Sequence, residues 1–386
     1  MTLKEIKSKF IRKETGSYIG KEIYSLEPLI NLHDPIFLAG PSRRPTDKDY
    51  KKPGWREDAV KQLRDAGFNG DIIIPEARDK VPIQDWNHRK QVDWETEGLH
   101  KAHRIFFWIP RSEELPAYTT NIEFGEWFKS GKIIVGWPNT AIRNDYLQDR
   151  LDKINVVRFH KIQEMVDDYM KYAETEPKIW FTSDTHFGQE RTRQYSYRPF
   201  RNIEEMDLSL FSSFNKYIRQ KDILIHLGDF GNYDALESLN VGKMLFFKGN
   251  YERKDIDNYK LNFLKKYSNI VSEISEDNNS IDLINPNNQD DIQTVYLGHE
   301  PTMAKGPKNG IYLFGHCHNR SMARLNGVDI GIDWQYRPLN ENDIWNFINT
   351  FRNKYWDEEI FTRYVGEKYK TDHVLTKNEL ETIKLL

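Results

Sequence analysis

The sequence has little cysteine and no long apolar run. Cys317 is the only cysteine among the 386 residues, so an internal disulfide is excluded and a reducing compartment is natural. No apolar stretch approaches the roughly 20 residues that a membrane-spanning helix needs. The N-terminal residues also lack the apolar centre of a secretory signal peptide. We therefore expect a cytoplasmic protein that does not enter a membrane.

An excess of charge of one sign is absent as well. The chain has 56 Lys and Arg against 59 Asp and Glu, which gives a net charge of -3. This balance argues against a protein that holds nucleic acid by bulk electrostatic attraction. With 386 residues, the chain is longer than one ordinary hydrophobic core accommodates, so it predicts two domains.

Apolar runs that resemble strands alternate with helical patterns along the chain, which predicts an α/β fold. The expected strands cover residues 35–40, 70–76, 103–110, 131–138, 222–231, 242–250, 294–301 and 310–318, and another begins at Lys178. The expected parts are an N-terminal extension (1–34), a first domain (35–158), a helical linker (159–177), a second domain (178–350) and a C-terminal extension (351–386). Residues 275–291 are rich in Asn and Asp, so we expect an exposed hairpin or loop there.

Side chains of metal-ligand type stand at five expected strand ends in the second half of the chain. They are Asp184, His186, Asp229, Asn250, His299, His316 and His318. In an extended chain, residues two apart point to the same side, so Asp184 with His186 and His316 with His318 are expected to converge. One such residue alone is more often a turn or core residue, but seven at strand ends favour a metal site. Mixed oxygen and nitrogen ligands suit two divalent cations, with Mn²⁺ favoured and Fe, Zn or Ni as alternatives.

The ordered blocks DxH, GD, GN, GH and GHxH resemble those of the calcineurin-like metallophosphoesterases over about residues 178–345. The flanking "SDTHFGQERT" and "YRPFRNIEEMD" are similar to one bacterial and phage branch. The resemblance implies an α/β sandwich and hydrolysis of a phosphate ester with two metals. It implies one metal at Asp184, His186, Asp229 and His318, and a second at Asn250, His299 and His316, with Asp229 bridging both.

Tyr251 departs from the pattern of that family, whose common form has His after the Asn. That His contacts the phosphate and can assist the leaving group. A tyrosine can still donate a hydrogen bond, but its ordinary pKa of about 10 makes it a poorer proton shuttle at neutral pH. The alternative is that Tyr251 only packs. His226, three positions before Asp229, is expected on the opposite face as a core residue.

In the first half, Glu123 stands near an expected helix start. Thr120 or Asn121 would be the N-cap, and Glu123 would lie in the first turn, where the helix dipole favours its ionised form. A glutamate that merely complements the dipole would occupy the same position. Trp94 and Glu95 stand at the start of another expected helix.

The expected strand 35–40 ends in a turn that can hold a sugar or a phosphate. It has Gly40 and Pro41 followed by Ser42, Arg43 and Arg44. The arginines would suit a 5′-phosphate, and a solvated loop is the alternative. The candidate substrate-binding residues are Gly40, Pro41, Ser42, Arg43, Trp94 and Asn121.

The blocks "IFLAGPSRR", "VDWETEGLHKAHRIFFWIPR" and "LPAYTTNIEFGEW" resemble the nucleoside 2-deoxyribosyltransferase superfamily over about residues 35–147. The resemblance implies a doubly wound, Rossmann-like parallel sheet. It implies Glu123 as the nucleophile at C1′ of the deoxyribosyl group and Glu95 as the carboxylate that binds and protonates the leaving base. Trp94, Phe124 or Trp127 would stack on the base. A homo-oligomer is a further expectation from the same resemblance.

Two departures from that family stand out. A second Asp upstream of the nucleophile has no counterpart, because Ala117 and Tyr118 occupy that region. His103 stands where related sequences often have Asp. Transferase, hydrolase and ligand-binding roles therefore all remain open for the first domain.

The sequence favours a bifunctional enzyme of nucleotide metabolism with a nucleoside, nucleotide or sugar-phosphate substrate. One domain would cleave or transfer an N-glycosidic bond, and the other would hydrolyse a phosphate ester. An alternative makes the first domain a nucleotide sensor without turnover. A third makes the second domain a phosphodiesterase that acts on nucleic acid ends or cyclic nucleotides.

Overall fold

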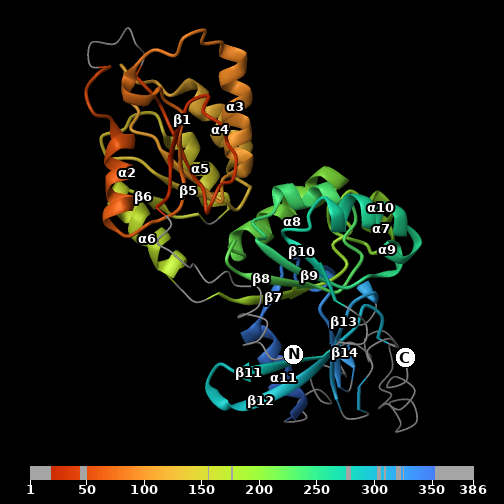
Figure 1. Cartoon of the computed structure of the whole chain (residues 1–386). Helices are drawn as coiled ribbons and strands as arrows, with labels where there is room; N and C mark the ends of the chain where they lie inside the picture. The colour runs from red at the N-terminus through yellow and green to blue at the C-terminus, as the bar shows by residue number, and fades with distance from the viewer. Residues whose placement is uncertain are drawn as a thin grey trace. The chain divides into compact units, whose positions relative to one another are not determined.

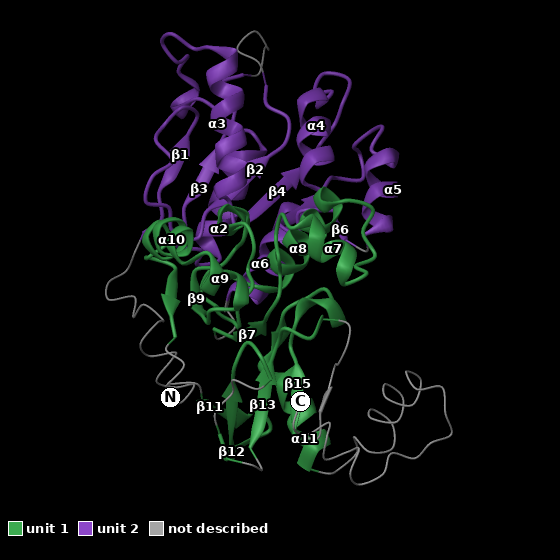
Figure 2. Ribbon diagram, turned by 90° about the vertical axis from the view of Figure 1, so that its right-hand side faces the viewer, with its two compact units in different colours: residues 1–13, 177–386 green, residues 14–176 purple. Residues whose placement is uncertain are grey.

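The computed structural model describes residues 19–43, 50–154, 156–174, 177–274, 280–301, 306–307, 310–318, 323–324 and 326–352. Arg44, most of the expected extension 1–34 and nearly all of the extension 351–386 lie outside this range. The described chain divides into two compact units that meet in sequence between residues 176 and 177 (Figure 2). Each unit is described by itself.

The first unit is built on a six-stranded sheet whose paired strands all run parallel. Its order is β1 (Glu22–Tyr24), β3 (Ile72–Ile74), β2 (Ile36–Ala39), β4 (Arg104–Trp108), β5 (Ile133–Gly136) and β6 (Arg158–Phe159). The central strands are apolar, apart from Arg104 at the start of β4, because helices cover both faces. The expected α/β class is confirmed here, and the parallel sheet is consistent with a Rossmann-like fold.

Helices cover both faces of this sheet (Figure 1). Alternate residues of its strands lie in two separate cores, one on each face. Phe37 of β2 lies in the core that α3 (His88–Lys101), α4 (Tyr118–Trp127) and α5 (Asp145–Lys153) complete. Leu38 lies in the opposite core, with α2 (Trp55–Asp65) and α6 (Ile162–Glu174). A short 3₁₀ turn, η1 (Arg78–Lys80), follows β3.

Two expected boundaries of the first unit need correction. β1 lies inside the expected extension 1–34, and its three residues are too short to give a periodic signal. The expected linker 159–177 contains α6, whose Met165, Val166 and Tyr169 are buried in the core of the first unit. These residues therefore belong to the first unit, because α6 buries its apolar face against the sheet.

The second unit contains two five-stranded sheets. The first has the order β10 (Val271–Glu273), β9 (Lys243–Phe246), β8 (Ile223–His226), β7 (Ile179–Thr182) and β16 (Leu339–Asn340), with only β16 antiparallel to its neighbour. The second has the order β11 (Ser280–Asn285), β12 (Asn288–Leu297), β13 (Ile311–Phe314), β15 (Gly327–Asp329) and β14 (Ala323–Arg324). In it, β12, β13 and β15 run parallel, and the edge strands β11 and β14 are antiparallel.

Alternation along the strands again divides the apolar side chains between two cores. Ile179 and Phe181 of β7 share a core with the second sheet and α11 (Glu341–Arg352), whereas Trp180 faces the helices on the other side. Those helical segments are α7 (Glu190–Tyr195), α8 (Ile203–Tyr217), η2 (Tyr233–Ser238), α9 (Asn250–Lys254), α10 (Ile256–Asn258) and the π-helix η3 (Tyr259–Lys265). The turn η6 (Ile332–Trp334) follows β15. The described part of the Asn/Asp-rich segment forms the β11–β12 hairpin, as expected.

Among the described residues, no helix combines the length and apolar character needed to cross a membrane.

Helix α8 allows a matched test of the second unit's core. Leu210 is fully buried against the sheet that contains β7, β8 and β9, whereas Leu208 on the same helix is 56% exposed. We expect Leu210→Ala to lower the free energy of unfolding by about 2–5 kcal/mol, because it removes buried methyl groups and leaves a cavity. The control Leu208→Ala should stay within about 0.5 kcal/mol. Urea unfolding followed by circular dichroism measures both, and equal effects would contradict this packing.

Candidate functional site

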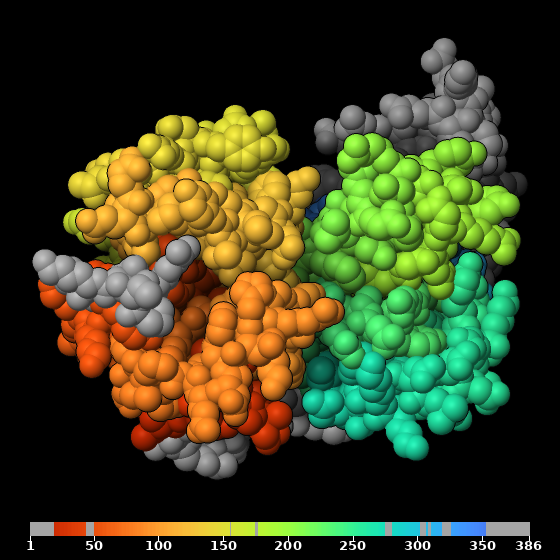
Figure 3. Space-filling model, turned by 90° about the horizontal axis from the view of Figure 1, so that it is seen from above, coloured from red at the N-terminus to blue at the C-terminus, as the bar shows by residue number. Residues whose placement is uncertain are grey.

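The strand order of the first unit reverses between β2 and β4. From β2 the chain crosses to β3 on one side and then returns to β4 on the other. In open parallel sheets, such a reversal leaves a crevice at the carboxyl ends of the two strands, where ligands bind. The expected sugar or phosphate turn at Gly40, Pro41 and Ser42 directly follows β2 and lies at this edge. Figure 3 shows the first unit hollowed between the orange segment that holds α3 and the lighter orange segment that holds α4.

A buried arginine, Arg56 of α2, holds this turn. Its side chain is 2% exposed and donates hydrogen bonds to the carbonyl oxygens of Leu38 (3.0 Å) and Gly40 (2.6 Å) and to Ser42 Oγ (2.9 Å). Glu76 Oε1 balances its charge at 2.6 Å. The sequence prediction missed Arg56, because Glu57 and Asp58 follow it directly and the local pattern gives no sign that it is buried.

Gly40 is required at this turn for two reasons. Its φ of 150° is rarely adopted by other residues, and a Cβ at this position would lie 2.2 Å from the carbonyl oxygen of Trp108. The backbone of β2 therefore approaches the end of β4 closely.

The structure places Glu95 and Glu123 differently within their helices than the pattern predicts. α3 begins after Asn87, whose side chain caps the backbone of Arg89 and Lys90, so Glu95 lies in the middle of the helix. α4 begins after Ala117, which has a left-handed φ of 58° and provides no side-chain cap. Glu123 therefore lies in the second turn. The start of α4 carries no capping residue, which is why the sequence pattern misplaced it.

The two glutamates lie close enough to influence each other's ionisation. Burial and the negative charge of Glu95 raise the pKa of Glu123 to about 7, against the opposing charge of Arg56. Burial also raises the pKa of Glu95, while a hydrogen bond from Gln91 and the charge of Arg56 oppose the shift. The expectation that the helix dipole keeps Glu123 ionised is therefore corrected, because burial outweighs it. Two neighbouring carboxyl groups whose pKa values are both raised by burial can serve as nucleophile and proton donor.

The candidate aromatic residues are mostly part of the core. Trp94 is 8% exposed, and its indole N–H donates to the carbonyl oxygen of Glu27 at 2.7 Å. Phe124 is buried and stacks on Phe128. Neither ring has an open face for a base, whereas Trp127 is only partly buried. The apolar spacing of these residues reflects packing.

The remaining polar candidates of the first unit lie at its surface. Asn121 is exposed, and its side-chain oxygen accepts a hydrogen bond from Arg111. Arg43 is also exposed, and its guanidinium reaches the carbonyl oxygen of Lys52 at 3.5 Å.

His103, which precedes β4, stands where related sequences often have Asp. Its Nδ1 lies 2.9 Å from the carboxylate of Asp34, so a carboxylate from another segment of the chain lies beside this position.

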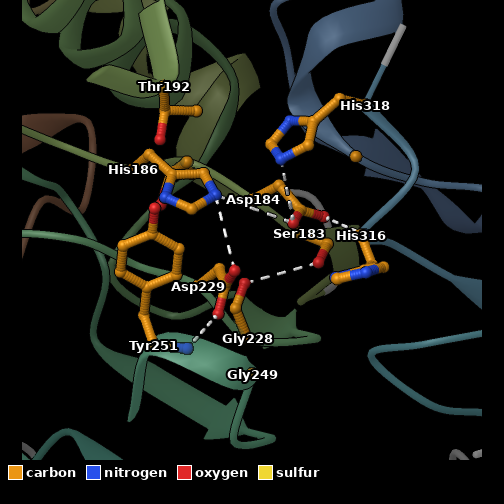
Figure 4. A network of polar contacts seen from close by, with 12 residues as sticks. Ser183, Asp184, His186, Thr192, Gly228, Asp229, Gly249, Tyr251, His316 and His318 are labelled. Carbon is orange, nitrogen blue, oxygen red and sulfur yellow. Dashed lines mark hydrogen bonds and ion pairs between the residues drawn. The ribbon is translucent and has the colours of Figure 1, made fainter. Parts of the chain in front are cut away.

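In the second unit, the structure brings all seven candidate metal ligands together at the carboxyl ends of the strands. Figure 4 shows Asp184, His186, Asp229, His316 and His318 of this cluster. Asp184 and His186 follow β7, Asp229 follows β8, Asn250 follows β9, His299 follows β12, and His316 and His318 follow β13. Asp184, His186 and His318 form one group, and Asp229, His299 and His316 form another; within each group the ligand atoms lie within 4.8 Å of one another.

Asp229 stands between the two groups. Its Oδ2 is 3.5 Å from His186 Nε2 of the first group and 3.5 Å from His299 Nε2 of the second. Asn250 Oδ1 joins the second group, at 3.0 Å from His299 Nε2 and 3.2 Å from His316 Nδ1. This is the position that a carboxylate shared by two cations would take.

The donor set fits divalent cations. Asp184 Oδ1 and His186 Nε2 are buried and have no hydrogen-bond partner among the described residues. Leaving such a group unsatisfied costs about 1–3 kcal/mol. The other ring nitrogen of His186 contacts Gln189 at 2.6 Å, and that of His299 contacts the carbonyl oxygen of Leu227 at 2.8 Å. Both rings are thus fixed with one nitrogen turned into the site, as in metal-binding histidines.

The backbone presents these ligands through turns rather than through extended strands. Five of the seven have left-handed φ values between 49° and 68°, namely Asp184, His186, Asp229, His316 and His318. Each such conformation costs a non-glycine residue about 1–3 kcal/mol and is concentrated at functional sites. The sequence prediction that these ligands converge was based on strand alternation. That reason is wrong, because β7 ends at Thr182 and β13 at Phe314, before the ligands.

The charges of the cluster compensate one another. Burial alone would raise the pKa of Asp184, but the positive charges of His299 and His318 hold it well below its ordinary value. Burial opposes ionisation of His299, yet Asp184 and Asp229 raise its pKa to about 9. The carboxylates are therefore ionised, which is the state that binds a cation.

Sequence reasoning missed the charged residues that hold the ligand loops. Arg198 is buried and donates to Asp333 (2.6 Å) and to the carbonyl oxygens of Asp184 (2.5 Å) and Thr185 (2.8 Å). Asp333 also lies 2.7 Å from His318 Nδ1, so one pair links the loops after β7 and β13. The signal available was charge in apolar surroundings, as in "GIDW".

Glu252 also holds a loop that carries a candidate ligand, the loop with Asp229. Its carboxylate accepts the backbone N–H groups of Asp229 (2.9 Å), Phe230 (2.9 Å) and Gly249 (2.8 Å). It thereby fixes the loop that carries Asp229 against the start of α9.

Tyr251 packs within the cluster. Its ring meets that of His186 edge-on, with centroids 4.9 Å apart, and its backbone N–H donates to Asp229 Oδ1 at 2.9 Å. Figure 4 shows the hydroxyl group beside His186 at the edge of the site. His226 is buried 3.0 Å from Thr185 Oγ1, and is a core residue as expected.

Comparison with known proteins gives matches over parts of the chain. An uncharacterized protein of Methanocaldococcus jannaschii, MJ1445, is 38% identical over 84 residues, which cover 20% of this chain and 47% of that protein. The chain thus spans about half the length of this curated relative. The crystal structure of AQ665, a protein of unknown function from Aquifex aeolicus, matches at 19% identity with a TM-score of 0.32, over 45% of this chain and all of the other. That likeness is too low to assign a fold.

A family model adds a match to the segment that contains the paired glutamates. Residues 33–141 match the family described as "Nucleoside 2-deoxyribosyltransferase like". The matched range includes the turn at Gly40, the buried Arg56 and both Glu95 and Glu123. Residues 33–141 therefore form a nucleoside 2-deoxyribosyltransferase-like domain.

Proposed function

We propose that this protein is a bifunctional enzyme of nucleotide metabolism. The first unit cleaves or transfers the N-glycosidic bond of a deoxynucleoside or deoxynucleotide. The second unit hydrolyses a phosphate ester with two divalent cations. The pair of glutamates at the strand reversal supports the first activity. The second activity is supported by the two ligand groups around Asp229. Asp184 Oδ1 and His186 Nε2 of the first group, which have no hydrogen-bond partner among the described residues, support it as well.

In the first unit, Glu123 is the nucleophile. Its carboxylate attacks C1′, and the bond between C1′ and the base nitrogen breaks, which leaves a glycosyl ester on Glu123. The leaving base takes a proton from Glu95. Water or another base then attacks C1′ and releases Glu123, and the choice between them decides hydrolase or transferase. The turn that Arg56 holds, at Gly40 to Ser42, lies where the sugar or its phosphate binds.

In the second unit, Asp184, His186, Asp229 and His318 would hold one cation, and Asp229, Asn250, His299 and His316 would hold the other, with Mn²⁺ favoured. The cations, when bound, polarise the phosphate ester and stabilise the charge that develops on it. Tyr251 donates a hydrogen bond to the phosphate from its place beside His186. Because tyrosine is a poor proton donor at neutral pH, esters with good leaving groups are the preferred substrates.

The two activities connect chemically. Glycosidic cleavage of a nucleotide releases a sugar phosphate, which is a phosphate ester. Removal of phosphate from a nucleotide releases a nucleoside, which has an N-glycosidic bond. Either order makes the product of one reaction a substrate for the other.

A second candidate function makes the first unit a nucleotide sensor that gates the phosphoesterase. The observation that favours it is the start of α4, where Ala117 and Tyr118 stand in place of a second carboxylate. Stoichiometric nucleotide binding without release of base would support the sensor, and catalytic release of base would exclude it.

The raised pKa of Glu123 predicts the pH dependence of base release. A nucleophile must be ionised, so the rate should rise with pH through a midpoint near pH 7 and level off above it. Glu95→Gln should shift the midpoint to lower pH, because it removes a negative charge that raises the pKa of Glu123. It should also lower the maximal rate by about 100-fold, because it removes the proton donor. Chromatography of free base between about pH 5 and about pH 9 measures both effects.

Two variants of α4 provide the control for this profile. Glu123→Gln should abolish base release, whereas Glu126→Gln, exposed on the same helix, should retain it. Base release that survives in Glu123→Gln would show that another group is the nucleophile.

Metal binding can be tested without turnover. Calorimetric titration of metal-free protein with Mn²⁺ should show two ions per chain. Asp333→Asn should weaken one of them by about 10–100-fold, because it removes the carboxylate that orients His318. The exposed Asp257→Asn should bind both ions normally. Absence of Mn²⁺ binding by the wild-type protein would refute the metal assignment, and normal binding by Asp333→Asn would refute the orienting role.

A further inference from the structure

The segment 22–29, here called the strap, ties down the helix that carries Glu95. It contains β1 and lies before residue 33, where the family match begins. The indole N–H of Trp94 donates to the carbonyl oxygen of Glu27 at 2.7 Å, and Lys101 Nζ donates to that of Leu29 at 2.8 Å. Both donors belong to α3. The strap is therefore anchored along the helix that presents the candidate proton donor.

One strap residue connects to Glu95 through a single intermediate. Ser25 is 8% exposed, and its backbone N–H donates to the carbonyl oxygen of Glu76 at 3.0 Å. Its hydroxyl donates to the side-chain oxygen of Gln91. The side-chain nitrogen of Gln91 donates to Glu95 Oε1 at 2.8 Å, one helical turn further along α3.

The ionised Glu95 carboxylate sets which way the Gln91 amide faces, and the hydroxyl of Ser25 holds the other end of the amide. A glutamine amide has an oxygen that only accepts and a nitrogen that only donates. With the oxygen held by Ser25, the nitrogen faces Glu95. If the amide turned over, its oxygen would face the Glu95 carboxylate and its nitrogen would face Ser25. The amide oxygen of Gln91 would then repel the ionised carboxylate of Glu95.

We propose that Ser25 and Gln91 are positioning residues, which hold the Glu95 carboxyl group in one orientation beside Glu123. The inference rests on the glycosidic activity proposed for the first unit. It gives Ser25, which lies outside the family match at residues 33–141, a part in that activity. The donor from Gln91 stabilises ionised Glu95 against the effect of burial. The positive charge of Arg56 acts in the same direction, so the hydrogen bond from Gln91 and this charge together set how readily Glu95 gives up its proton.

The test compares Gln91→Met and Ser25→Ala with Arg78→Met. Arg78 binds the strap through Glu27 at 2.7 Å but does not touch Ser25 or Gln91. We expect Gln91→Met to lower kcat for base release by about three- to tenfold with little change in KM, because the variant loses one hydrogen bond to Glu95. Ser25→Ala should act in the same direction, and Arg78→Met should leave kcat unchanged.

A second measurement follows Glu95 itself. Titration of glutamate carboxyl carbons by NMR should show a higher pKa for Glu95 in Gln91→Met than in the wild type and in Arg78→Met. An unchanged Glu95 titration in Gln91→Met, or an equal loss of kcat in Arg78→Met, would overturn the positioning role. The titration needs no turnover, so it decides the role of Gln91 even if the wild-type protein releases no base.

Discussion

Charge buried at the carboxyl ends of parallel strands must find a partner, and both units are organised by this requirement. Burying an ionised group costs several kcal/mol, about 3–5 when one partner of a buried pair is removed. In the first unit, Arg56 is matched by Glu76 and by the carbonyl oxygens of the turn after β2. In the second, Arg198 is matched by Asp333 and by the carbonyl oxygens after β7. Arg56 thereby fixes the candidate sugar or phosphate turn after β2, and Arg198 fixes the loop that carries Asp184 and His186.

The buried polar groups that lack a full set of partners are those to which we assign catalysis or metal binding. Glu123 receives no net stabilisation of its charge, so its pKa rises to about 7. Asp184 Oδ1 and His186 Nε2 are left without hydrogen bonds among the described residues, while the neighbouring atoms of the same side chains are held. The left-handed backbone at five of the seven ligands adds a further local cost. The two apolar cores and the buried clamp of Glu252 offset that cost within the second unit.

The sequence predicted the frame of both units well, because central parallel strands are continuous apolar runs bounded by polar turns. It failed where the signal was short or non-local. β1 has three residues, and α4 begins without a capping side chain, so both escaped the pattern. Arg56 and Arg198 bind carbonyl oxygens brought close only by folding, and no local spacing reveals such contacts. Trp94 and Phe124 shared the periodicity of a binding face, but that periodicity came from the core.

Product analysis by mass spectrometry with two variants tests the separation of the activities most directly. Wild-type protein, Glu123→Ala and Asp229→Asn would each be incubated with deoxynucleosides and their 5′-monophosphates in the presence of Mn²⁺. We expect release of base from deoxynucleosides to disappear only in Glu123→Ala, and release of phosphate from monophosphates only in Asp229→Asn. Base release that survives in Glu123→Ala, or phosphate release that survives in Asp229→Asn, would contradict two independent sites with these residues at their centres.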